Sequence, residues 1–136
     1  MRFATGGVAA PFSLDWTCVI RLGSGDWPDL ISEKLFAADL LPVCTPALAK
    51  TLRRPDDLKS APLLRVAHAG DDWLRWFKAA GLPRVPVRGP VFDYYGQSLQ
   101  AAADGVGVAV GIRSYIDDDA RRAACRAIRD LCAEGR

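Results

Sequence analysis

The chain has 136 residues, a length typical of one domain, and half of them are apolar, which is enough to bury a core. Its 18 basic and 16 acidic residues leave a formal charge of only +2, too little to favour nucleic-acid binding by bulk electrostatics. No apolar run approaches the roughly 20 residues that cross a bilayer, so we expect no membrane partner.

The N-terminal part of the chain predicts an irregular arm followed by a strand. Residues 1–13 contain glycine and proline and show neither helical nor strand periodicity. Residues 17–22 are β-branched and apolar, which is typical of a strand, and a second short apolar run follows at Leu40–Cys44. Thr45 is then a good N-cap, and proline suits the first position of a helix that we expect over residues 46–53.

The clearest predicted helix covers residues 71–80. Asp71 or Asp72 can cap its start, and Gly81 lies just past its end. Four apolar residues recur at helical spacing and share one face: Trp73, Trp76, Phe77 and Ala80. An aromatic stripe of this kind predicts a helix that packs on a sheet.

Further strands and helices alternate along the rest of the chain. Short strands are predicted near residues 63–67, 91–93 and 106–110, with a helix over 97–104 between the last two. Residues 120–136 read as a C-terminal helix behind three aspartates. Strands that alternate with helices indicate an α/β domain with a largely parallel sheet.

The cysteines do not form a disulfide framework or a zinc site. They stand singly, without a C-x-x-C pair, at positions Cys18, Cys44, Cys125 and Cys132. We interpret them as reduced thiols of a cytoplasmic protein, since no secretory signal precedes them. No metal and no cofactor is expected.

Catalysis and nucleotide binding are also disfavoured. His68 is the only histidine, and a structural role in a loop is its more ordinary interpretation. The glycine pairs Gly23-x-Gly25 and Gly105-x-Gly107 do not complete a dinucleotide-binding motif in a strand-to-helix context. The chain therefore offers no paired constellation for an enzyme.

Open α/β sheets bind ligands at the carboxyl ends of strands, beside helix N-termini. Three segments of this chain have that position and are candidates for a ligand site. They supply hydroxyls, an amide and free backbone N–H groups but no base or nucleophile, which predicts binding of a small polar or anionic molecule without turnover. The candidate residues are Gly23, Ser24, Gly25, Thr45, Tyr94, Tyr95, Gly96 and Gln97.

Several segments together resemble a known family. They are DWTCVIRLGSGDWPDL from residue 15, LLPVCTPA from residue 40, DDWLRWFKAAGLP from residue 71 and GPVFDYYGQSLQAAADGVGVAVG from residue 89. In this order they resemble the effector-binding region of LysR-type transcriptional regulators, and most closely the branch of the glycine-cleavage and β-lactamase activators. The resemblance covers residues 14–119.

The resemblance implies a fold similar to type 2 periplasmic binding proteins, in which a small effector binds between two α/β subdomains. Residues 17–23 then correspond to the end of the first subdomain, 41–45 to the crossing strand and 46–119 to most of the second subdomain. It implies Thr45 at the hinge, and the glycines at 23 and 25 on the lip opposite the tyrosines at 94 and 95.

Two departures from the family bear on function. The chain shows no counterpart of the family's winged helix-turn-helix, so we expect no direct operator binding. Residues 120–136 read as a helix where the family returns through a strand. Our leading hypothesis is a truncated effector-binding module that self-associates. The alternatives are a protein that pairs with itself or with full-length regulators, or a gene fragment without independent function. The sequence does not identify the effector.

Overall fold

The computed structural model describes residues 12–13, 15–21, 25–82, 85–113, 116 and 126–127. The chain divides into two compact units, residues 1–37 and 38–136, each of which is described by itself.

The described residues of the first unit form neither helix nor strand. The predicted strand over residues 17–22 is therefore wrong for residues 17–21, and residue 22 lies outside the described part. The side chains of residues 17–20 are exposed. A strand requires a neighbour for its backbone N–H and C=O groups, and no described segment of this unit pairs with these residues. β-branched composition alone does not supply that partner.

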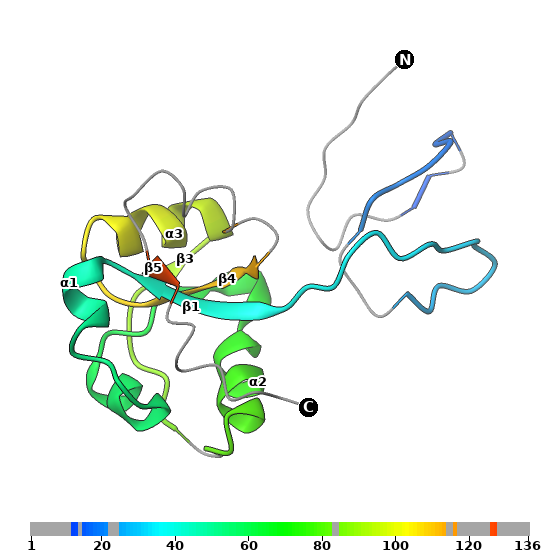
Figure 1. Cartoon of the computed structure of the whole chain (residues 1–136). Helices are drawn as coiled ribbons and strands as arrows, with labels where there is room; N and C mark the ends of the chain where they lie inside the picture. Colours follow the sequence, from blue (N-terminus) through cyan, green and yellow to red (C-terminus); the bar gives the residue numbers. More distant parts are fainter. Residues whose placement is uncertain are drawn as a thin grey trace. The chain divides into compact units, whose positions relative to one another are not determined.

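The second unit is built around strand β1, Leu40–Cys44 (Figure 1). Strand β4, Ala109–Ile112, runs antiparallel to it, with Leu40 opposite Ile112 and Val43 opposite Ala109. Strand β5, Arg126–Ala127, pairs antiparallel with the other edge of β1. The strand order is thus β4-β1-β5, with β1 in the centre.

A parallel pair of strands extends the other side of β4. Strands β2, Arg65–Val66, and β3, Val91–Phe92, pair in parallel, and a parallel bridge joins Leu63 to Val108. The α/β class is confirmed, but the pairing is mixed and not largely parallel. The reason is that β1 runs against β4, whereas the segments at Leu63 and Val91 run with it.

The helix predicted over residues 120–136 is wrong where it can be compared. Arg126–Ala127 form strand β5 against Val43 and Cys44 of β1. The other residues of the predicted helix lie outside the described part of the chain. The local preference of this segment for a helix is weaker than the gain from strand pairing with the free edge of β1.

The first predicted helix begins at the expected residue. Helix α1, Pro46–Ala49, starts after Thr45, whose Oγ1 accepts a hydrogen bond from the Leu48 N–H at 3.3 Å. The helix is shorter than the predicted span to residue 53. A 3₁₀ helix, η1, follows over Pro55–Ser60, so Pro55 begins an element instead of only ending one.

Helix α2, Asp72–Ala79, confirms the predicted aromatic stripe. Trp73, Trp76 and Phe77 are buried, and the Trp73 ring stacks on Phe77 with centroids 5.6 Å apart. The Trp73 Nε1–H donates to the Leu64 carbonyl at 2.8 Å, so the buried indole has its partner. Gly81 has a φ of 75°, the left-handed conformation expected just after a helix.

Successive side chains of a strand point to opposite faces of the sheet. Both faces of this sheet carry buried apolar side chains. Cys44 and Val108 join the core cluster that contains the α2 aromatics, whereas Val43 and Ala109 join a second cluster with Ala102. Ala102 belongs to helix α3, Tyr95–Ala103. Helices α2 and α3 therefore cover opposite faces of the sheet (Figure 1).

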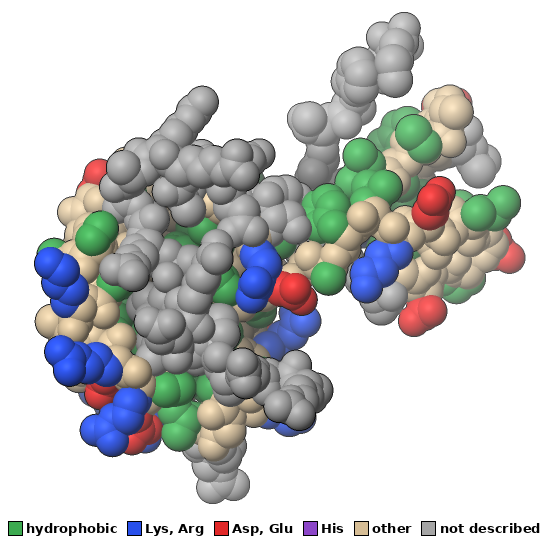
Figure 2. Space-filling model, viewed as in Figure 1, with side chains coloured by type: hydrophobic (Ala, Val, Ile, Leu, Met, Phe, Trp, Pro, Cys, Tyr) green, Lys and Arg blue, Asp and Glu red, His purple; other side chains and the backbone are tan. Residues whose placement is uncertain are grey.

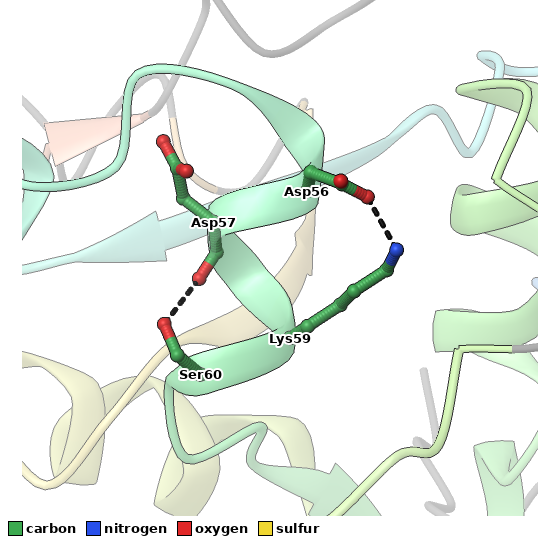
Figure 3. A network of polar contacts seen from close by, with 4 residues as sticks. All are labelled: Asp56, Asp57, Lys59 and Ser60. Carbon is green, nitrogen blue, oxygen red and sulfur yellow. Dashed lines mark hydrogen bonds and ion pairs between the residues drawn. The ribbon is translucent and has the colours of Figure 1, made fainter.

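A carboxylate caps the start of η1. Asp57 Oδ2 accepts hydrogen bonds from the backbone N–H groups of Arg53 and Arg54 at 2.8 and 2.9 Å. These bonds hold the pKa of the Asp57 carboxyl below its ordinary value. Asp56, one residue earlier, forms an ion pair with Lys59 at 2.5 Å instead (Figure 3). Of these two adjacent aspartates, only Asp57 caps the helix.

The lowered pKa gives the Asp57 cap a defined pH dependence. Its contribution to stability is present above the unfolded carboxyl pKa of about 3.9 and is lost as the pH falls through the lower folded value. We expect Asp57→Asn to lower the free energy of unfolding in urea at pH 7 and to lose that effect in acid. Asp56→Asn removes only an exposed ion pair and is the matched control. Equal effects of the two variants at pH 7 would contradict this role of Asp57.

Candidate functional site

The carboxyl ends of β2 and β3 lie at the same edge of the sheet, because the two strands are parallel. A 3₁₀ helix, η2, Ala67–Ala69, follows β2 directly. Helix α3 follows β3 after two residues, with Tyr94 as its N-cap. The His68 Nδ1 lies 3.0 Å from the Asp93 carbonyl oxygen and joins the two segments. This edge brings together a histidine, two tyrosines and an amide.

Tyr95 lies at the centre of this cluster. Its ring meets the His68 ring edge-on, with centroids 5.6 Å apart and an interplanar angle of 81°. Its hydroxyl donates a hydrogen bond to Oδ2 of Asp72, the first residue of α2. Burial, and then the hydrogen bond to the Asp72 carboxylate, raise the pKa of Tyr95 above its ordinary value. Tyr95 therefore stays protonated as a donor at neutral pH.

Asp72 has a different role from the one that the sequence suggested. We expected Asp71 or Asp72 to cap α2, but Asp71 occupies the N-cap and makes no side-chain capping bond. Asp72 is buried and accepts from the Tyr95 hydroxyl. Arg75 Nη1 lies 3.8 Å from Asp72 Oδ1, and the Arg75 side chain is mostly exposed. The carboxylate thus links the first turns of two helices.

The other predicted residues of this turn are open to solvent. Tyr94 is 66% exposed, and Gln97 Oε1 accepts a hydrogen bond from the Tyr94 N–H at 3.3 Å. A Cβ built on Gly96 would meet no atom within 4 Å, so the space beside the first turn of α3 is open. Tyr94, Gly96 and Gln97 are thus exposed at the start of α3, whereas Tyr95 is half-buried.

Thr45 does not belong to this surface. It follows the carboxyl end of β1, which runs antiparallel to β4, so it lies at the opposite edge of the sheet. A Cβ on Gly105 would lie 3.8 Å from Thr45 Cγ2, and Gly105 comes just after the C-terminal end of α3. Thr45 and Tyr95 are therefore at opposite ends of α3. The expectation that the two share one site overlooked the antiparallel direction of β1.

The glycine loop belongs to the first unit. Gly23 and Ser24 lie outside the described residues. Gly25 has a φ of 92°, and its carbonyl accepts a hydrogen bond from the Ser32 Oγ at 2.7 Å. This contact closes a local turn.

Sequence reasoning missed His68 and Asp72 as neighbours of the candidate site. His68 was interpreted as a structural loop residue and Asp72 as a helix cap. The sequence contains a signal for His68. It follows β2 as Tyr94 follows β3, and residues that follow neighbouring parallel strands lie at the same edge of a sheet. Which helix face Asp72 occupies depended on the packing of α2, which the local sequence does not determine.

The groups at this edge can donate and accept hydrogen bonds. Within the described ranges, no three His, Cys, Asp or Glu side chains gather as metal ligands do. The first-turn N–H groups of a helix have no acceptor within the helix, and the helix dipole places partial positive charge there. None of the described helices is both long and apolar enough to cross a membrane.

A mixed sheet covered by helices on both faces, with polar groups gathered at the carboxyl ends of its strands, defines an α/β ligand-binding domain. Residues 15–134 match the family described as LysR substrate binding domain, and the chain belongs to that family. The match extends through the C-terminal segment in which we expected a departure from the family.

Named relatives and solved structures agree with this assignment. The chain is 42% identical over 91 residues to the transcriptional activator AmpR of Rhodobacter capsulatus, covering 67% of this chain and 31% of the relative. It is 38% identical over 117 residues to the glycine cleavage system transcriptional activator of Escherichia coli K12, covering 82% and 38%. The chain thus spans about a third of the length of these relatives.

The effector domain of the regulator AmpR from Pseudomonas aeruginosa superposes with a TM-score of 0.70 at 38% identity. The superposition covers 79% of this chain and 52% of that domain. The AmpR effector binding domain from Citrobacter freundii gives a TM-score of 0.69 at 31% identity, with coverage of 79% and 55%. The expected periplasmic-binding-protein-like fold is confirmed, and the matched relatives are transcriptional regulators.

The Tyr95–Asp72 bond predicts a large effect of removing one hydroxyl. Tyr95→Phe leaves the buried Asp72 carboxylate without its hydroxyl donor, so we expect a loss of about 1–3 kcal/mol in the free energy of unfolding at pH 7. Tyr94→Phe, at an exposed ring, is the control and should change stability by less than about 0.5 kcal/mol.

The same pair of variants tests the raised pKa of Tyr95. Because its folded pKa is raised, the protonated hydroxyl contributes stability that is fully present below the ordinary value of about 10 and is lost at higher pH. The stability gap between wild type and Tyr95→Phe should therefore narrow above about pH 10. A gap independent of pH in this range would contradict a buried hydroxyl donor.

Proposed function

We propose that the chain is the small-molecule effector-binding module of a LysR-type transcriptional regulator, and that the effector binds at the carboxyl ends of β2 and β3. One observation carries this proposal: the exposed Tyr94 and Gln97, at the start of α3, and the exposed His68, after β2, lie at that edge. Membership of the LysR substrate binding domain family supports the same function.

The start of α3 favours an anionic or strongly polar effector. Tyr94 at the N-cap lacks the short side-chain oxygen that usually caps a helix. The first backbone N–H groups of α3 are then available to an acceptor, and the helix dipole favours negative charge on it. Gln97 uses its Oε1 for the Tyr94 N–H, which leaves its NH₂ group as a further donor.

We further propose binding without turnover. The described edge holds a histidine, a buried carboxylate and tyrosine hydroxyls, and no described serine or cysteine forms a hydrogen bond with the histidine. The relatives are named as transcriptional activators. Because transcription in bacteria takes place in the cytoplasm, we propose that this module acts there and that it does not itself contact operator DNA.

We also propose self-association as a property of the first unit. Its described residues expose many large apolar side chains, seen as green patches in Figure 2. They are Trp16, Val19, Ile20, Leu30, Ile31, Leu35 and Phe36. Apolar surface of this extent in a segment without secondary structure favours burial against another polypeptide.

Isothermal titration of the chain with a panel of small carboxylic, hydroxy and amino acids tests the proposed function. A ligand from the panel should bind wild-type protein, and Gln97→Ala should weaken its affinity about tenfold through the loss of one hydrogen bond to a charged group. Thr45→Val, at the opposite edge, is the control and should leave the affinity unchanged. Weaker binding by Thr45→Val with normal binding by Gln97→Ala would overturn the proposed location.

A further inference from the structure

The orientation and tautomer of His68 are set by its neighbours. The Asp93 carbonyl, 3.0 Å from Nδ1, is only an acceptor, so Nδ1 carries the hydrogen and donates it. In the neutral ring, Nε2 is then unprotonated and presents a lone pair. Since the two nitrogens lie on different sides of the ring, Nε2 points away from the β3 backbone.

The His68 ring is held without involving Nε2. Tyr95 packs edge-on against the ring, and the Tyr95 hydroxyl is in turn fixed by Asp72. None of the described residues makes a hydrogen bond to Nε2, and the His68 side chain is exposed. The structure therefore presents an oriented hydrogen-bond acceptor beside the first turn of α3.

The two sides of this edge have opposite hydrogen-bonding character. The first turn of α3 offers backbone N–H donors with partial positive charge, and the Gln97 amide adds a further donor group. Nε2 of His68 offers an acceptor. A single small molecule that satisfies both sides carries an anionic group and, a short distance away, an N–H or O–H donor.

We propose that His68 is an effector-contacting residue whose Nε2 accepts a hydrogen bond from the ligand. The ligand class is a small organic anion with its own donor, such as a hydroxy acid or an amino acid. The inference rests on the proposed effector site and adds the chemistry that site selects. An anion without a donor leaves Nε2 unpaired when it displaces water, which lowers its affinity.

Because His68 is the only histidine, its ring nitrogens can be observed directly by ¹⁵N NMR of the wild-type chain. Glycolate and acetate form one matched pair of probes, and L-lactate and propionate a second, since each pair differs only in a hydroxyl donor. We expect the free protein to show the Nδ1–H tautomer at pH 8. Glycolate and L-lactate should shift the Nε2 resonance and bind about five- to tenfold more tightly than acetate and propionate.

Two variants distinguish the effect of the Nε2 acceptor on binding from the effect of the aromatic ring. His68→Phe keeps an aromatic ring against Tyr95 but has no acceptor, so the preference for the hydroxy acids should disappear. His68→Gln keeps an acceptor oxygen and should retain part of the preference. Circular dichroism and the melting temperature of both variants confirm that they fold.

Each outcome of these titrations has a defined meaning. Preference for the hydroxy acids in wild type and its loss in His68→Phe support the inference. If all four probes perturb the amides of residues 94–98 with equal affinity in wild type and both variants, the His68 contact is overturned and the proposed effector site stands. If no probe perturbs residues 94–98, the proposed site is overturned, and the His68 contact with it.

Discussion

The hydrogen bond from the Tyr95 hydroxyl to the Asp72 carboxylate is the contact on which the candidate site depends. Helices α2 and α3 cover opposite faces of the sheet, so this bond joins their first turns across the edge where β2 and β3 end. It fixes the Tyr95 ring against His68, and His68 in turn donates to the backbone before α3. Tyr95 thus contacts both Asp72 and His68, and this series of contacts connects α2, the segment after β2 and the start of α3.

The direction of β1 determines which residues share the site. Since β1 runs against β4, its carboxyl end and Thr45 lie beside Gly105, at the C-terminal end of α3. The strands at Leu63 and Val91 run with β4, so their carboxyl ends meet at the other edge. Ligands of open α/β sheets bind at the carboxyl ends of the strands. Because β1 is reversed, its strand-to-helix turn at Thr45 lies at the opposite edge from the turns that follow β2 and β3.

Much of the second unit could be predicted from local sequence. The aromatic spacing of α2, the threonine and proline at α1 and the turn before α3 each specify an element through nearby residues alone. Strand pairing could not be predicted, because it depends on distant segments: Val19 and Ile20 are apolar and β-branched yet form no strand, and Arg126–Ala127 pair although their surroundings favour a helix. The roles of His68 and Asp72 were missed for the same reason, since both arise from contacts across more than 20 residues.

We propose that the effector binds at the carboxyl ends of β2 and β3, at the edge of the sheet opposite Thr45. Hydrogen–deuterium exchange of the chain, with and without a bound ligand, tests it most directly, since backbone amides that donate to a ligand exchange more slowly. We expect slower exchange at residues 67–69 and at 94–98, with no change at 45–49. Slower exchange confined to residues 45–49 would contradict it.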